Sequence, residues 1–101
     1  MGSGANSQVG AGARPAGGPP TIVLRLFASA RQAAGTGRVE MVAATVGEAL
    51  GAAEARYGDP FTRVLRTSKV WVNGVEALPT TVLAEDDEVA VLPPVSGGVA
   101  G

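Results

Sequence analysis

A strand that reaches residues 92–98, with the sequence LPPVSGG, cannot continue through them as a strand. The two prolines hold φ at about −65° and lack the amide hydrogens that a β-ladder needs. Gly97 and Gly98 follow without side-chain bulk. The segment therefore ends a fold with a stiff, thin backbone, which suits insertion into a narrow channel on a partner. The alternative interpretation is an ordinary glycine-rich terminus.

The composition argues against an enzyme that works by itself. The 101 residues include no cysteine and no histidine, which excludes thiol nucleophiles and removes the usual general base and the commonest metal ligand. We therefore expect no metal site. Eight Lys plus Arg against nine Asp plus Glu give a net charge of −1. No run of positive charge is present, so a nucleic-acid partner is not expected.

The chain is expected to hold one domain between two loose ends. Residues 1–20 are mostly Gly, Ala, Ser and Pro, and they are predicted to be disordered because they bury too little apolar surface. Residues 21–95 are the predicted domain, and residues 96–101 are a predicted flexible tail. No apolar run approaches the ~20 residues of a membrane span, and the start lacks a signal-peptide pattern. We expect a cytoplasmic protein without a membrane partner.

Alternating apolar residues predict the strands. The expected strands are residues 21–27, 38–42, 69–72, 75–78 and 88–92. Asn73 and Gly74 form the dipeptide most typical of a type I′ hairpin turn between two of them. Trp71 is interpreted as a packing residue.

One main helix is predicted between Thr45 and Tyr57. Thr45 and Glu48 have the spacing of a capping box, and apolar residues then recur at helical spacing until Gly58. A shorter helix is expected between a second such box, at Ser29, and residue 35. Residues 61–65 are expected to form only a short apolar turn.

Three segments resemble one protein family. They are residues 26–31 (LFASAR), residues 72–74 (VNG) and residues 87–98 (DEVAVLPPVSGG). Through them the chain, from Thr21 to Gly98, is similar to the MoaD family of the MoaD/ThiS superfamily. These proteins are ubiquitin-like sulfur carriers that form the small subunit of molybdopterin synthase. The resemblance implies an α+β fold, the ubiquitin-like β-grasp, in which one main helix packs across one face of a mixed sheet.

The resemblance also implies a reaction at the tail. A MoeB-like E1 adenylating enzyme would use ATP to activate the carboxylate of Gly98, and sulfur transfer would make a thiocarboxylate. A MoaE-like large subunit would then transfer the sulfur to precursor Z in molybdenum cofactor biosynthesis. Gly97 would provide clearance beside Gly98. The chain would bind no cofactor, and it would be a non-catalytic carrier subunit.

A docking surface is implied as well. Phe27 and Leu92 match apolar positions that family members use to contact both partners, and each is on the strand face opposite the core residues. Arg31 aligns with a family arginine near the same surface, where a solvated charge is nearly as good an interpretation. The expected partner-binding residues are Phe27, Arg31, Leu92, Pro93, Pro94 and Val95.

The end of the chain departs from the family pattern. Family members end at the second glycine, whereas this chain continues with residues 99–101 (VAG), so the Gly98 carbonyl is in a peptide bond. Either a processing protease removes these three residues, or this copy is inactive or altered.

Three other functions remain open. The chain could carry sulfur for another pathway, such as cysteine or thiamine synthesis. It could be a ubiquitin-like protein modifier that is joined to lysines through the same glycine. It could also be a β-grasp interaction module that never uses its tail.

Overall fold

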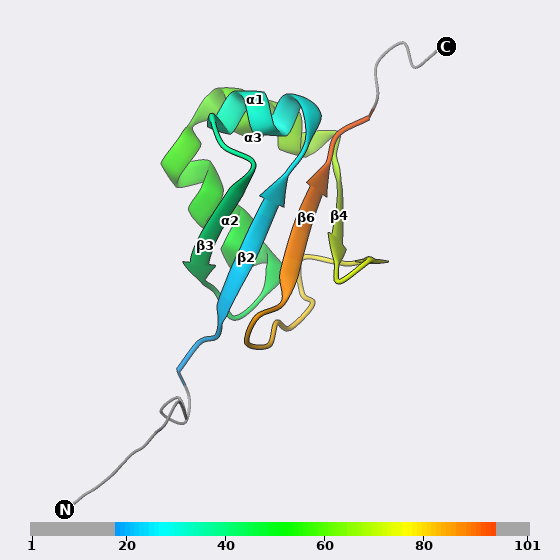
Figure 1. Cartoon of the computed structure of the whole chain (residues 1–101). Coiled ribbons are helices and arrows are strands. Elements are labelled where there is room, and N and C mark those ends of the chain that lie inside the picture. The colour runs from blue at the N-terminus through cyan, green and yellow to red at the C-terminus, as the bar shows by residue number, and fades with distance from the viewer. Residues whose placement is uncertain (1–17, 95–101) are drawn as a thin grey trace, which may run out of the picture.

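The computed structural model describes residues 18–94 (Figure 1). Its elements are β2 (Thr21–Leu26), α1 (Ala28–Ala34), β3 (Arg38–Val42), α2 (Val46–Tyr57), α3 (Asp59–Arg66), β4 (Lys69–Val72), β5 (Val75–Glu76) and β6 (Glu88–Leu92). The predicted disordered segment, apart from residues 18–20, and the predicted tail of residues 96–101 lie outside the described residues.

The strands form one mixed sheet in the order β3-β2-β6-β4-β5. The first and last strands, β2 and β6, pair in parallel at its centre, and the other neighbouring pairs are antiparallel. Asn73 and Gly74 join β4 to β5 with φ of 50° and 86°. Both values are positive, as the predicted type I′ turn requires.

The core lies between the sheet and the helices. Alternate residues of β2 are buried, and Leu24 and Leu26 lie opposite Val89 and Val91 of β6, so both central strands present valine or leucine to the same side. Figure 1 shows α2 behind the strands, with α1 and α3 over the end toward which β2 and β6 run. The helices contribute the buried side chains Ala30, Val46, Ala49, Ala53 and Phe61.

The main helix begins as predicted. The Glu48 N–H donates to Thr45 Oγ1 at 3.2 Å, and Glu48 Oε1 in turn accepts from the Ala44 N–H at 2.9 Å. These bonds satisfy amide groups that the first turn of a helix leaves free.

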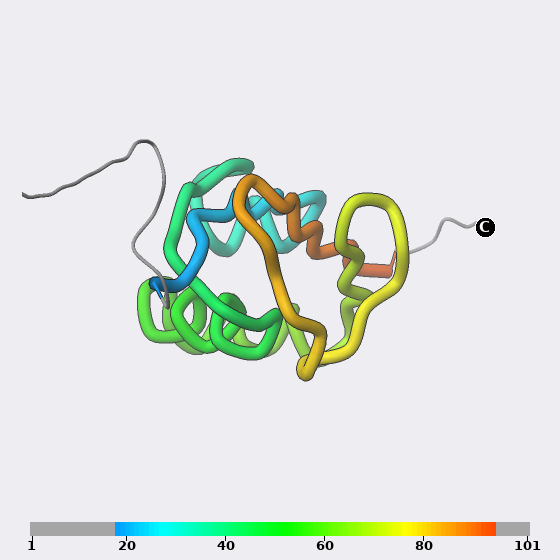
Figure 2. The backbone as a smooth tube through the Cα atoms, turned by 90° about the horizontal axis from the view of Figure 1, so that it is seen from below, coloured from blue at the N-terminus to red at the C-terminus, as the bar shows by residue number. Residues whose placement is uncertain are grey.

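The loop after β5 satisfies two further amides at the start of α2. The Val46 N–H donates to Thr81 O at 3.0 Å, and the Gly47 N–H donates to Pro79 O at 2.8 Å. Figure 2 shows this loop passing below the start of α2 before the chain turns into β6. The loop is thereby fixed to the helix.

Two helix predictions were wrong in detail. The expected turn at residues 61–65 is a helix, α3, and Pro60 lies in its first turn, where the missing N–H costs no hydrogen bond. Phe61 of this helix is fully buried. The capping box at Ser29 does not form, because α1 already begins after Phe27 and has no side-chain cap. Gly35 ends α1 as expected, with φ of 79°.

Candidate functional site

One face of the sheet carries no helix (Figure 1), and the candidate site lies on this open face, where β2 and β6 end. Leu26 of β2 is opposite Val91 of β6, and both are core residues. Phe27, which directly follows β2, and Leu92, the last residue of β6, come next in the two chains and therefore lie side by side on the open face. The Phe27 N–H donates to Val91 O at 3.3 Å, which continues the pairing by one residue.

Phe27 is held while its ring stays accessible. The residue is 39% exposed, and the Arg25 guanidinium carbon lies 5.6 Å from the ring centroid, a cation–π distance. Arg25 Nη1 also donates to Glu88 Oε2 at 2.7 Å, while its Nε is buried without a hydrogen-bond partner. Because Arg25 is tied to β6 in this way, it supports the Phe27 ring from one side.

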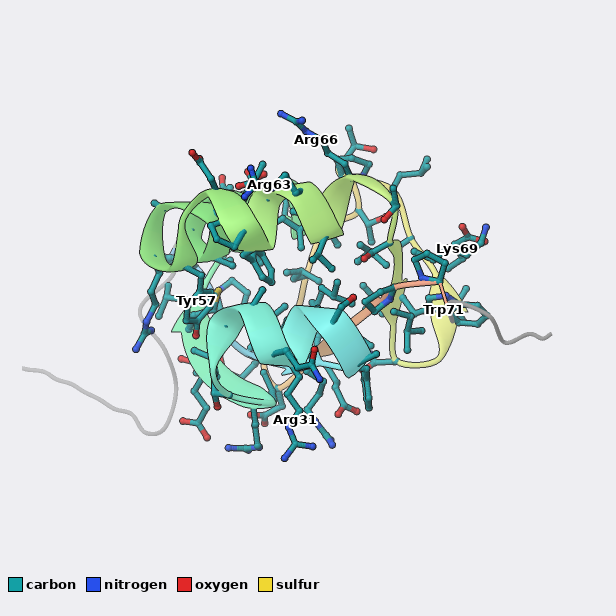
Figure 3. The ribbon with its side chains drawn as sticks, turned by 90° about the horizontal axis from the view of Figure 1, so that it is seen from above. Arg31, Tyr57, Arg63, Arg66, Lys69 and Trp71 are labelled. Carbon is teal, nitrogen blue, oxygen red and sulfur yellow. The ribbon has the colours of Figure 1, made fainter. Side chains whose placement is uncertain are left out.

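The base of the tail lies in a shallow groove of about 300 Å³, the tail-base groove. Its lining residues are Thr67, Lys69, Trp71, Leu92, Pro93 and Pro94. Pro93 is buried and Pro94 is exposed, so the chain is anchored at one proline and leaves the domain at the next. Figure 3 shows Lys69 and Trp71 at the side of the domain where the ribbon of the described residues ends after β6.

The pairing of β4 with β6 explains which residues line the tail-base groove. Lys69 is opposite Leu92, and Trp71 is opposite Ala90, so all four share the open face. Trp71, interpreted from the sequence as a packing residue, is only partly buried there. Sequence reasoning did not select Lys69 or Arg25, since neither has a signal until the strand pairing is known.

The structure brings four of the expected site residues together: Phe27, Leu92, Pro93 and Pro94. Arg31 is exposed on α1, four residues after Phe27, and it makes no ion pair within residues 18–94. Figure 3 shows it on the outer side of α1, and it does not line the tail-base groove. Val95, Gly97 and Gly98 lie outside the described residues.

Within residues 18–94, no group of three or more His, Cys, Asp or Glu side chains is placed to hold a metal ion. No helix there is long and apolar enough to cross a membrane.

Solved structures similar to this chain share its fold. SAMP1 from Haloferax volcanii has 33% sequence identity and a TM-score of 0.68, over 77% of this chain and 99% of that one. A putative molybdopterin converting factor subunit 1 from Pyrococcus furiosus has 24% identity and a TM-score of 0.67, over 75% and 99%. Subunit 1 in a complex of molybdopterin-converting factor subunits 1 and 2 from Helicobacter pylori has 19% identity and a TM-score of 0.61, over 77% and 99%.

Sequence comparison identifies the family directly. No curated protein matches the chain at a significant level. The family model described as the ThiS family matches residues 24–98, which run from the first strand through Gly98. Together with the mixed sheet and its β-grasp relatives, this match confirms both the predicted superfamily and the predicted α+β fold. The chain belongs to the ThiS family, within the MoaD/ThiS superfamily of ubiquitin-like β-grasp proteins.

Proposed function

We propose that the chain is a cytoplasmic sulfur carrier for molybdenum cofactor biosynthesis, which holds sulfur as a thiocarboxylate on Gly98. The observation that carries this proposal is the parallel pairing of β2 with β6. The pairing places an accessible apolar surface, Phe27 and Leu92, next to the anchored base of the tail at Pro93. A partner that docks on this surface would receive the tail in a defined direction.

The chemistry of the proposal takes place on the partners. In the E1-like enzyme, the Gly98 carboxylate attacks the α-phosphate of ATP and releases pyrophosphate. Hydrosulfide (HS⁻) from the sulfur source then displaces AMP from the acyl adenylate and leaves the thiocarboxylate. The large subunit transfers the sulfur from Gly98 to precursor Z. The sequence supports a carrier role, since it has neither histidine nor cysteine for such steps. The Helicobacter pylori complex supports a MoaE-like second subunit as partner.

Removal of residues 99–101 belongs to the proposal. Gly98 has no carboxylate while Val99 follows it, because the Gly98 carbonyl lies in a peptide bond. The β-branched Val99 would also add bulk where two glycines have none. We therefore include a processing protease among the partners.

Mass spectrometry tests the proposal. The full chain and a chain that ends at Gly98 are each incubated with the E1-like enzyme of the same organism, ATP and a sulfur source. We expect the shorter chain alone to gain the mass of one sulfur in place of one oxygen. The proposal fails if the chain ending at Gly98 is neither adenylated nor thiolated, and the trimming step fails if the full chain reacts equally well.

A protein modifier is the second candidate, because the 33% identical relative is named a small archaeal modifier protein in one of its structures. In that function, Gly98 would form isopeptide bonds with lysines of other proteins. Lysine-linked conjugates of the chain, recovered from its host and absent for a variant without Gly97 and Gly98, would favour the modifier. A carrier for another pathway would instead be thiolated normally, but it would not supply sulfur to a MoaE-like subunit.

A further inference from the structure

The turn between β4 and β5 joins the two residues that are most prone to asparagine deamidation. A type I′ turn needs positive φ at both of its central positions, and Asn73 and Gly74 have φ of 50° and 86°. Gly74 has no side chain that could shield its backbone nitrogen from the amide carbon of Asn73. Both residues are exposed to water. The residues that the turn requires therefore also form a candidate modification site.

Deamidation at this place needs water and no other reactant. The Gly74 nitrogen loses its proton and bonds to Asn73 Cγ, the C–N bond of the side-chain amide breaks, and ammonia leaves. Water then opens the resulting succinimide ring at one of its two carbonyls. One opening leaves an aspartate, and the other leaves an isoaspartate, in which the main chain runs through the former side chain. The net change is the loss of ammonia and the gain of water.

The folded chain holds the Asn73 amide by two hydrogen bonds to the start of β6. The Glu88 N–H donates to Asn73 Oδ1 at 3.0 Å, and Asn73 Nδ2 donates to Asp87 Oδ1 at 2.8 Å. We call these two bonds the Asn73 clasp. Ring closure also needs the Gly74 nitrogen nearly eclipsed with Asn73 Cβ, whereas the first central residue of a type I′ turn has ψ of about +30°. The folded turn therefore lacks both the side-chain and the backbone freedom that the reaction needs.

Asp87, one partner in the Asn73 clasp, is itself fixed by the surrounding chain. The Ala84 N–H donates to Asp87 Oδ2 at 2.8 Å, and the Asp87 N–H donates to Ala84 O at 3.1 Å. Asp87 O accepts from the Val23 N–H of β2 at 2.9 Å. Figure 1 shows β4 ending beside the start of β6, which is the corner of the sheet that the clasp joins. The clasp therefore forms only when the start of β6 lies in place between β2 and β4.

We propose that Asn73 is a deamidation site that is protected while β6 is paired with β4 and reacts when the start of β6 is detached. Its partners Asp87 and Glu88 follow it by 14 and 15 residues, so protection depends on long-range pairing and not on the dipeptide itself. The rate in the folded chain then follows the small fraction of molecules in which this corner is open. The site does not depend on the proposed function, since no partner protein takes part.

The products of the reaction cannot rebuild the Asn73 clasp. An aspartate at this position has no donor for Asp87, and two carboxylates would meet where a hydrogen bond of 2.8 Å now lies. An isoaspartate adds a methylene group to the main chain of a two-residue turn, whose length sets the register of β4 and β5. A molecule that has reacted once therefore opens more often at this corner.

Deamidation rates of the full chain test the proposal. The chain is incubated in mildly alkaline buffer, either folded or unfolded in guanidinium chloride, and is digested at intervals. Mass spectrometry follows the peptide that contains Asn73, and isoaspartate methyltransferase measures the isoaspartate formed. We expect the folded chain to react at least about 100-fold more slowly than the unfolded chain. Equal rates in the two states overturn the proposal.

Variants separate the Asn73 clasp from overall stability. Asp87→Ala removes the acceptor for Asn73 Nδ2, and we expect the rate in the folded chain to rise about tenfold. Asp86→Asn removes the same charge from the same turn and tolerates its φ of 69°, and the Asp86 side chain makes no hydrogen bond within residues 18–94.

A second control weakens the fold elsewhere. Ala53→Gly destabilises the buried side of α2 and leaves the Asn73 clasp intact. Urea unfolding measures how far each variant is destabilised. For Ala53→Gly and Asp86→Asn we expect at most about a twofold rise in the deamidation rate. A rise for Asp87→Ala no larger than that for an equally destabilised Ala53→Gly overturns the proposal, since opening of the whole domain would then explain both.

Asn73→Asp tests the effect of the product. Its urea midpoint should lie below that of Asn73→Ala at low salt, because a second carboxylate faces Asp87, and the difference should shrink at high salt. A midpoint equal to that of the unmodified chain would mean that the product rebuilds the clasp, which contradicts this part of the proposal.

Discussion

Truncation of Phe27 is expected to weaken partner binding by an amount that follows from its exposure. Its 39% exposure, applied to a Phe surface of about 200 Å², leaves about 80 Å² for a partner to cover. At about 25 cal/mol per Å² this area contributes about 2 kcal/mol to binding. Phe27→Ala should therefore raise the Kd for the E1-like enzyme about 30-fold.

The measurement is calorimetric titration of the enzyme with chains that end at Gly98. Val42→Ala is the matched control, because Val42 is 57% exposed on the same open face but lies at the end of β3, opposite Thr21 at the start of β2 and away from Leu92. Urea unfolding of both variants establishes that each is folded at the titration temperature. We expect the control to bind within about twofold of the unmodified chain. The reasoning is refuted if Phe27→Ala binds equally well, or if Val42→Ala loses as much affinity.

Three further predictions concern stability, each measured by urea unfolding. Phe61→Ala removes a fully buried ring that the sequence placed in a turn, and it should lower the free energy of unfolding by about 3–5 kcal/mol; a loss below about 1 kcal/mol would mean that α3 does not close the core. Thr45→Ala should cost about 1 kcal/mol, whereas Thr45→Ser, which keeps the cap acceptor, should cost less than half of that. Asn73→Ala should cost about 1–2 kcal/mol, because the side chain accepts from the Glu88 N–H at 3.0 Å and donates to Asp87 at 2.8 Å; an unchanged midpoint would contradict this.

Local patterns account for the elements that the sequence predicted well. The alternation in β2 leaves Leu24 and Leu26 only one side on which to be buried, and the capping box at Thr45 and Glu48 forms as its spacing indicates. The start of α3 is harder to predict from the segment Gly58 to Pro60, because the same residues that end one helix also suit the first turn of the next. The sequence therefore predicts a turn where the structure has the helix α3.

The candidate site also has residues that the sequence predicts and residues that it does not. Phe27, Leu92 and the two prolines could be found because the resemblance assigns them and the strand pattern agrees. Lys69 and Trp71 could not, since their place at the site depends on the pairing of β4 with β6 across about twenty residues of chain. Nothing in the local sequence of β4 specifies which strand lies beside it.

The central place of β6 in the sheet has a consequence for synthesis on the ribosome. When the chain has been translated only to residue 87, β2 can pair with β3 and β4 with β5, but the strand that joins these two hairpins does not yet exist. Contacts of such long sequence separation form late and fold slowly. The domain therefore closes only once residues 88–92 have emerged, immediately before the residues that carry its proposed function. A prematurely terminated chain would remain unfolded, and it would not compete with finished copies for their partners.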